Sequence, residues 1–195
     1  MAAWIAGLII LAIIIWAIVA YNRLIAFRNS ISNAHGQIDV QLRRRYDLVP
    51  NLVEIARKYM QHERETLEAV TLARARAVSA SDALRAKPSS ALAAGALTDA
   101  EGALSMGLGR LLALSEAYPE LKANETLRDL REELTSTENR VAFTRQAYND
   151  EVLAFNNALQ SFPDLMVAKV FGFEAAGVLR ATDNAQQRET VRIAL

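Results

Sequence analysis

The feature that most constrains this 195-residue chain is an uncharged apolar run at its N-terminus, residues 1–21, with the sequence MAAWIAGLIILAIIIWAIVAY. As an α-helix this run is about 32 Å long at roughly 1.5 Å per residue, enough to cross the hydrocarbon core of a bilayer. Trp4, Trp16 and Tyr21 lie near its ends, where amphipathic aromatic rings prefer the membrane interface. The run therefore predicts a transmembrane anchor.

A cleaved signal peptide is the alternative for such a run. It is disfavoured because no Lys or Arg precedes the apolar stretch, which is also longer than a typical signal core, and because Ile18 occupies the first small-residue position of a cleavage site. Arg23, Arg28 and the triplet 43–45 follow the run. The positive-inside rule then predicts an N-terminus outside and the rest of the chain in the cytoplasm.

The remaining chain has helical periodicity. Apolar residues recur at steps of three and four from Leu24 to Leu42, which predicts one helix running from the anchor to about Arg45. Asp47 is the expected N-cap of a second helix, with Pro50 in its first turn. Residues 81–96 are expected to be a loop or a frayed helix end, and a third helix should follow as far as Pro119.

The strongest periodic signal lies in a fourth helix, expected from an N-cap at Asn124 to Pro163. Six apolar residues there lie exactly one heptad apart: Leu127, Leu134, Val141, Tyr148, Phe155 and Phe162. Such a repeat packs on other helices in a left-handed arrangement. A two-chain coiled coil is the alternative, but the short connections favour an all-α fold in which the transmembrane helix continues into an elongated antiparallel four-helix bundle.

In an antiparallel bundle of four helices, the end of the fourth helix returns to the bilayer. The chain then divides into four segments. They are an anchor (1–21), a helical bundle (22–162), a short membrane-proximal apolar helix (163–174) and a loose C-terminal tail (175–195). The short helix is apolar nearly all round, so it either caps the bundle or lies in the lipid interface. The candidate lipid-contacting residues are Leu165, Met166, Lys169, Val170, Phe171 and Phe173.

Two further surfaces are candidates for protein contacts. An amide stripe on the first helix, Asn22, Asn29 and Asn33, is either ordinary polar surface or a self-association face. At the end of the bundle far from the membrane, arginines should meet the turn before the fourth helix and form a docking tip for an acidic partner, unless they only stabilise helix ends. The tip residues are Arg43, Arg44, Arg45, Tyr46, Asp47, Tyr118, Glu120 and Lys122.

The composition contains little that supports catalysis. The absence of cysteine excludes disulfides, thiolate catalysis and cysteine metal sites. The two histidines, His35 and His62, lack metal-ligand spacing, and no phosphate-binding loop or nucleophile–base set is present. We therefore expect no catalytic, cofactor or metal site. The 22 basic and 22 acidic residues also give no support to nucleic-acid binding.

Three ordered blocks resemble the LemA family of bacterial membrane proteins: QIDVQLRRRYDLVPNLVE (37–54), LLALSEAYPELKANE (111–125) and LTSTENRVAFTRQAYNDEVLAFNNALQSFP (134–163). The closing VAKVFGF (167–173) also matches the family pattern. The resemblance implies a single N-terminal span in the bacterial inner membrane and an elongated helical bundle. It implies no catalytic residues, and some members are linked to membrane organisation, including magnetosome membrane formation.

Two functions follow as hypotheses. The first is a non-enzymatic scaffold that self-associates and organises or shapes the membrane, with the lipid bilayer and a second copy as its partners. The second is an adapter that docks on another membrane protein, such as a protease or a signalling protein.

Overall fold

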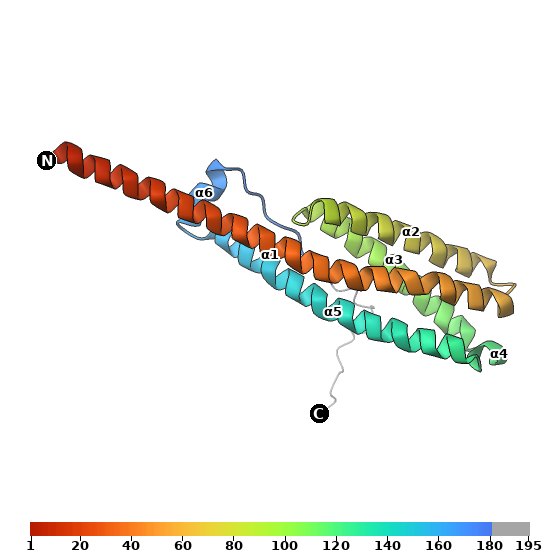
Figure 1. Cartoon of the computed structure of the whole chain (residues 1–195). Helices are drawn as coiled ribbons and strands as arrows, with labels where there is room; N and C mark the ends of the chain where they lie inside the picture. Colours follow the sequence, from red (N-terminus) through yellow and green to blue (C-terminus); the bar gives the residue numbers. More distant parts are fainter. Residues whose placement is uncertain (181–195) are drawn as a thin grey trace, which may run out of the picture.

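The computed structural model describes residues 1–180 and contains helices but no strands in that range. The long helices are α1 (Ala2–Tyr59), α2 (Arg64–Ala86), α3 (Ala91–Ser115) and α5 (Glu125–Gln160). The short ones are α4 (Pro119–Lys122) and α6 (Asp164–Val170). α1 projects beyond the other helices at its N-terminal end, and the turns near α4 lie at the opposite end (Figure 1).

The predicted continuity of the anchor with the first body helix is confirmed, but its predicted end near Arg45 is wrong. α1 continues through Pro50 to Tyr59, a total of 58 residues. A proline inside a helix leaves the carbonyl four residues earlier without its backbone donor. Here that carbonyl belongs to Tyr46, and the Nε atom of Arg74 donates a hydrogen bond to it at 2.6 Å. A side chain from α2 thus compensates for the missing N–H, and Asp47 is not a helix cap.

The other helix boundaries agree more closely with the periodic pattern. The Asn124 side chain accepts a hydrogen bond from the Leu127 N–H at 3.0 Å and caps α5 as predicted. The segment 81–96 is mostly helical, because α2 reaches Ala86 and α3 restarts at Ala91 behind a Ser90 cap. The connection is therefore only residues 87–90.

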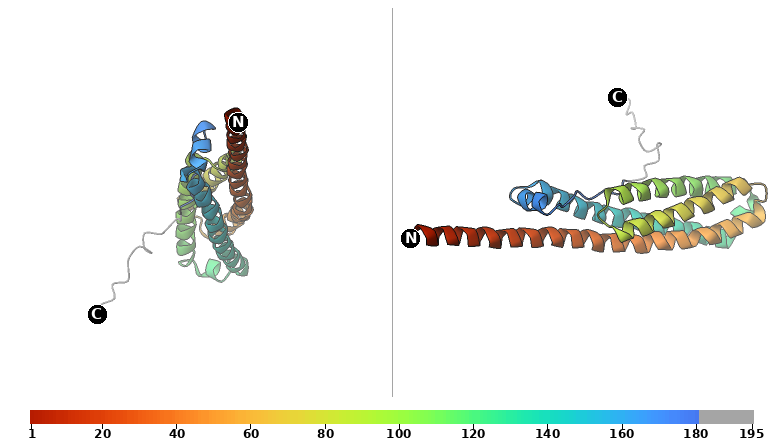
Figure 2. Two further views of the ribbon diagram at one scale, coloured as in Figure 1. Left: turned by 90° about the vertical axis from the view of Figure 1, so that its left-hand side faces the viewer. Right: turned by 90° about the horizontal axis from the view of Figure 1, so that it is seen from above.

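Packing joins the helices in pairs. α1 packs most extensively on α5 and α2 on α3, while α1 also contacts α2 (Figures 1 and 2). Gly107 brings α3 close to α2, since a Cβ atom there would lie 3.3 Å from Cγ2 of Val70. We call residues 22–170 the helical body. Its core includes the fully buried rings of Tyr148 and Phe155, two members of the predicted heptad line.

Candidate membrane-facing site

The N-terminal part of α1 is exposed although it is apolar. Ile9, Ile13 and Leu8 are all more than half exposed, and continuous burial of α1 begins only near Ala20 and Leu24. Within residues 1–180, α1 is the one helix that is long and apolar enough to cross a membrane. A core helix of a soluble protein would be buried, so the exposure fits the predicted anchor.

The short helix α6 packs beside α1 where the apolar run ends (Figure 1). Val167 and Ala168 are buried against α1 and α5, and the buried Asp164 carboxylate pairs with the guanidinium of Arg23. An aromatic cluster continues the contact. The Tyr21 ring lies 4.8 Å from that of Phe171 and 5.8 Å from that of Phe173, between ring centroids.

The opposite side of α6 is exposed and apolar. Phe162, Met166 and Val170 form this surface, which we call the basal patch, and Phe162 is 80% exposed. Phe171 is also partly exposed, but its ring lies against Tyr21 of α1. Lys169 is exposed beside the basal patch, whereas Leu165 and Phe173 are half-buried. The segment thus combines the two alternatives left open by the sequence: one side caps the body and the other side faces outward. Contiguous exposed apolar side chains of this kind mark contact sites.

The chain after α6 is not loose as predicted, at least as far as Arg180. Residues 171–180, here called the strap, run along α5 and are held by amide side chains. Asn156 both donates to the Ala176 carbonyl at 3.0 Å and accepts from the Ala176 N–H at 2.8 Å. Asn149 makes the same pair of bonds with Leu179, each 2.9 Å long. The predicted tail from 181 onward lies outside the described residues.

Two further contacts hold the strap. The Tyr148 hydroxyl lies 2.8 Å from the Pro88 carbonyl and 3.0 Å from the Gly177 carbonyl. A Cβ atom on Gly177 would approach Cα of Ala91 to 2.4 Å, so only glycine fits there. Sequence reasoning missed this function of the asparagines. The available signal was the seven-residue spacing of Asn149 and Asn156, which places both amides on one face of α5.

The predicted docking tip does not form, because Arg45 is buried and residues 43–47 lie in the interior of α1 instead of at its end. Arg45 is only 4% exposed, and its guanidinium bonds to Glu101 at 2.6 Å, Ser105 at 2.8 Å and Glu138 at 3.0 Å. The Tyr46 hydroxyl donates to Glu101 at 2.5 Å. Burial and the neighbouring Glu101 carboxylate raise the pKa of Tyr46.

The flanking arginines lie on the surface and are paired. Arg43 contacts Asp39 at 3.2 Å and Asp82 at 3.3 Å, and Arg44 bonds to Glu133 at 2.7 Å. Asp47 is exposed in the middle of α1. Because α1 is longer than predicted, its end lies at least a dozen residues beyond these side chains.

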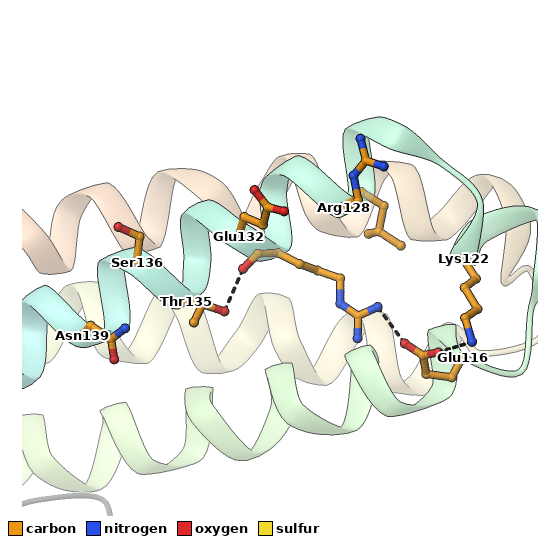
Figure 3. A pocket seen from close by; sticks show the side chains of 9 residues that line it. Glu116, Lys122, Arg128, Glu132, Thr135, Ser136 and Asn139 are labelled. Carbon is orange, nitrogen blue, oxygen red and sulfur yellow. Dashed lines mark hydrogen bonds and ion pairs between the residues drawn. The ribbon is translucent and has the colours of Figure 1, made fainter.

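The remaining predicted docking residues, which lie in and next to α4, are at the tip of the body. A cavity of about 670 Å³ lies there between α5 and the end of α3 (Figure 3). Glu116 pairs with Lys122 at 3.0 Å and with Arg131 at 2.7 Å, and the hydrogen bonds from Arg131 and Lys122 lower its pKa. Tyr118 is half-buried and Glu120 is exposed. Two of the three cations that line this cavity, Lys122 and Arg131, are thus paired with one of its own carboxylates.

The amide stripe of α1 lies on the surface of the body, and Asn29 also lines a cavity at its membrane-proximal end. Asn22, Asn29 and Asn33 are all exposed, and no hydrogen bond joins their side chains to other residues in the range 1–180. Their proposed use in self-association stays a prediction.

Neither histidine is placed in a metal-binding group among the described residues. His62 is exposed at the tip, whereas His35 is buried in α1, 6.3 Å from the Tyr148 ring between centroids. Burial lowers the pKa of His35, and the nearby Arg85 lowers it further while Asp39 opposes the shift. The imidazole is therefore held neutral.

We expect the free energy of unfolding to decrease as the pH is lowered through about 6.5. In this range His35 binds a proton in the unfolded chain but stays neutral when it is buried in the folded chain. Replacing His35 by Gln should flatten the profile just below about pH 6.5. Urea titrations of the full chain in detergent micelles at several pH values measure this. Equal slopes for wild type and H35Q would contradict it.

Asp39 adds a second pH dependence of the unfolding free energy, at lower pH. Burial raises the pKa of Asp39, but hydrogen bonds from Arg85, Arg43 and Ser81 outweigh the burial and lower it.

Comparison with known proteins agrees with this architecture. Residues 34–194 match the model of the LemA family. The chain is also 32% identical over 79 residues to the magnetosome protein MamQ of Magnetospirillum gryphiswaldense, which covers 40% of this chain and 29% of that protein. It is 32% identical over 81 residues to the magnetosome protein MamQ 2 of Paramagnetospirillum magneticum, covering 42% and 30%. The matches thus span less than a third of the length of these relatives. Because the family model covers most of its length, this chain belongs to the LemA family.

Proposed function

We propose that this protein is a non-enzymatic, membrane-anchored helical scaffold that self-associates and helps to organise or shape the bacterial inner membrane. The observation that carries the proposal is the position of the basal patch: an exposed apolar surface lies beside the point where the exposed apolar helix enters the body. Two lipid contacts at one end would fix the tilt of the body relative to the bilayer.

The proposal includes an orientation and a helix arrangement. We propose that the body is cytoplasmic, which the arginines after the span support. We also propose that α1, α2, α3 and α5 form an antiparallel four-helix bundle, supported by the pairing of Asp39 with Arg85 and of Arg44 with Glu133. A cysteine placed at the exposed Ala75 should resist an impermeant thiol reagent in intact cells, and its labelling would overturn this orientation.

Lipid contact by the basal patch is directly testable, because the chain contains no cysteine. A single cysteine at Val170, labelled with an environment-sensitive fluorophore in the full chain reconstituted into vesicles, should emit at shorter wavelength and be quenched by brominated lipid. The matched control is a cysteine at Met106, which is also exposed and apolar but lies on α3, away from α6. Quenching at position 170 no stronger than at position 106 would show that membrane contact is confined to the anchor.

Self-association is supported by the free amide stripe of Asn22, Asn29 and Asn33, since interhelical side-chain amides stabilise helix contacts near and within membranes. The purified chain in detergent should show a particle size that rises with protein concentration. A constant monomeric size at all concentrations would remove this part of the proposal.

A further inference from the structure

A second cavity lies at the membrane-proximal end of the body. Its volume is about 750 Å³, and α1, the connection between α2 and α3, and the strap enclose it. The lining includes Tyr21, Arg28, Lys87, Ser89, Phe171 and Glu174. The connection at 87–90 lies at the end of the α2–α3 pair that faces α6 and the anchor (Figures 1 and 2).

The cations of this cavity differ from those of the cavity at the tip in how they are paired. Arg28 comes from α1 and Lys87 from the opposing connection, and no ion pair joins either cation to another residue within 1–180. At the tip, by contrast, Lys122 and Arg131 both pair with Glu116. Glu174 is the carboxylate that lines this membrane-proximal cavity, so the lining has one more positive than negative side chain. Two cations that line one cavity without an ion-pair partner in the described range provide donors for an anion.

The distance between the cavity and the end of the anchor indicates which kind of anion can reach it. Tyr21 ends the apolar run, and Arg28 follows seven residues later, which is about 10 Å along the helix axis. The headgroup layer on one side of a bilayer is about 5–8 Å deep. Basic side chains extend toward it when their stems lie above it. The aromatic rings of Tyr21 and Phe171, 4.8 Å apart between centroids, form the wall nearest the anchor.

We infer that this cavity binds the headgroup of an anionic phospholipid, with its phosphate between Arg28 and Lys87 and its glycerol end against Tyr21 and Phe171. Basic pockets beside membrane spans recognise lipid headgroups in this way. The inference rests on the proposed membrane contact of the body, because that contact brings a headgroup to the mouth of the cavity. It adds a selectivity for lipid charge that the apolar basal patch does not have.

The test is a calorimetric titration of the full chain, purified in a neutral detergent, with short-chain lipids. Dihexanoyl phosphatidylglycerol should bind more tightly than dihexanoyl phosphatidylcholine. Arg28→Gln and Lys87→Gln should each weaken phosphatidylglycerol binding about fivefold, the value expected for one basic charge near an anionic lipid. Glu174→Gln should strengthen it by a similar factor. Arg64→Gln, an exposed cation at the tip, is the matched control and should change nothing.

The opposite sign expected for Glu174 separates recognition from misfolding, because a damaged fold would weaken binding in every variant. Unchanged phosphatidylglycerol affinity in both R28Q and K87Q would overturn the site. Equally tight binding of glycerol 1-phosphate would assign the cavity to a soluble phosphate ester and overturn the lipid assignment. Tighter binding of dihexanoyl phosphatidylethanolamine that is lost in E174Q would also overturn it, since the carboxylate would then bind the ammonium group. The fluorescence test at Val170 has a separate readout, so failure of the basal patch and failure of this site are distinguishable.

Discussion

Arg45→Met should lower the free energy of unfolding by about 3–5 kcal/mol, the loss expected when one partner of a buried ion pair is removed. Methionine retains most of the side-chain volume, so the loss reports charge rather than a cavity. Without Arg45, the Glu101 carboxylate, itself mostly buried, keeps only the Tyr46 hydroxyl as a hydrogen-bond donor. Urea unfolding of the full chain in detergent micelles, followed by helical circular dichroism, measures the change.

The neighbouring residue provides the control for that experiment. Arg44 also forms an ion pair, with Glu133 at 2.7 Å, but both side chains are about half exposed to solvent. Arg44→Met should therefore cost no more than about 1 kcal/mol. Glu101→Gln in the Arg45→Met background should recover part of the loss, because the unpaired buried charge is removed. Equal losses for R45M and R44M would show that the buried cluster does not stabilise the fold.

Phe155→Ala and Tyr148→Ala should each lower the free energy of unfolding by about 3–5 kcal/mol, the range for truncating a buried aromatic ring. Both rings are fully buried: the Tyr148 ring lies near His35 of α1, and the Phe155 ring lies near Phe173 of the strap. Tyr148→Phe separates the ring from its hydroxyl: it should cost only about 1 kcal/mol, the net value of the hydrogen bond that the hydroxyl donates between the Pro88 and Gly177 carbonyls.

Phe162 is the matched control on the same heptad line. It has the same side chain as Phe155 and lies one heptad later, but it is 80% exposed. Phe162→Ala should change the free energy of unfolding by less than about 0.5 kcal/mol. Thermal melts of the three alanine variants in one detergent compare them directly. A loss for F162A as large as that for F155A would mean that the basal end of α5 is buried rather than exposed.

Phe162 also shows where the periodic pattern stops being informative. A heptad repeat predicts which residues share a helix face, and it correctly placed Tyr148 and Phe155 in the core. It does not determine where the helix itself ends. α5 ends at Gln160, so Phe162 lies just beyond the helix and outside the packed seam.

The local sequence was therefore sufficient to predict that these helices form. The uncharged run of 21 residues, the 3.6-residue periodicity and the Asn124 cap determined an apolar N-terminal helix, an all-helical body and the start of α5, because each depends on neighbours in sequence. The ordered sequence blocks were also sufficient to identify the family.

Tertiary contacts decided the rest, because they join residues far apart in the chain. Proline usually ends a helix, but Arg74 from α2 supplies the Tyr46 carbonyl with a donor and allows α1 to continue past Pro50. That extension moves Arg45 from an expected surface tip into a buried ion pair. The strap is likewise held where Asn149 and Asn156 bind a backbone twenty to thirty residues later. The seven-residue spacing of these asparagines places both amides on one face of α5, but no local pattern identifies the distant backbone that they bind.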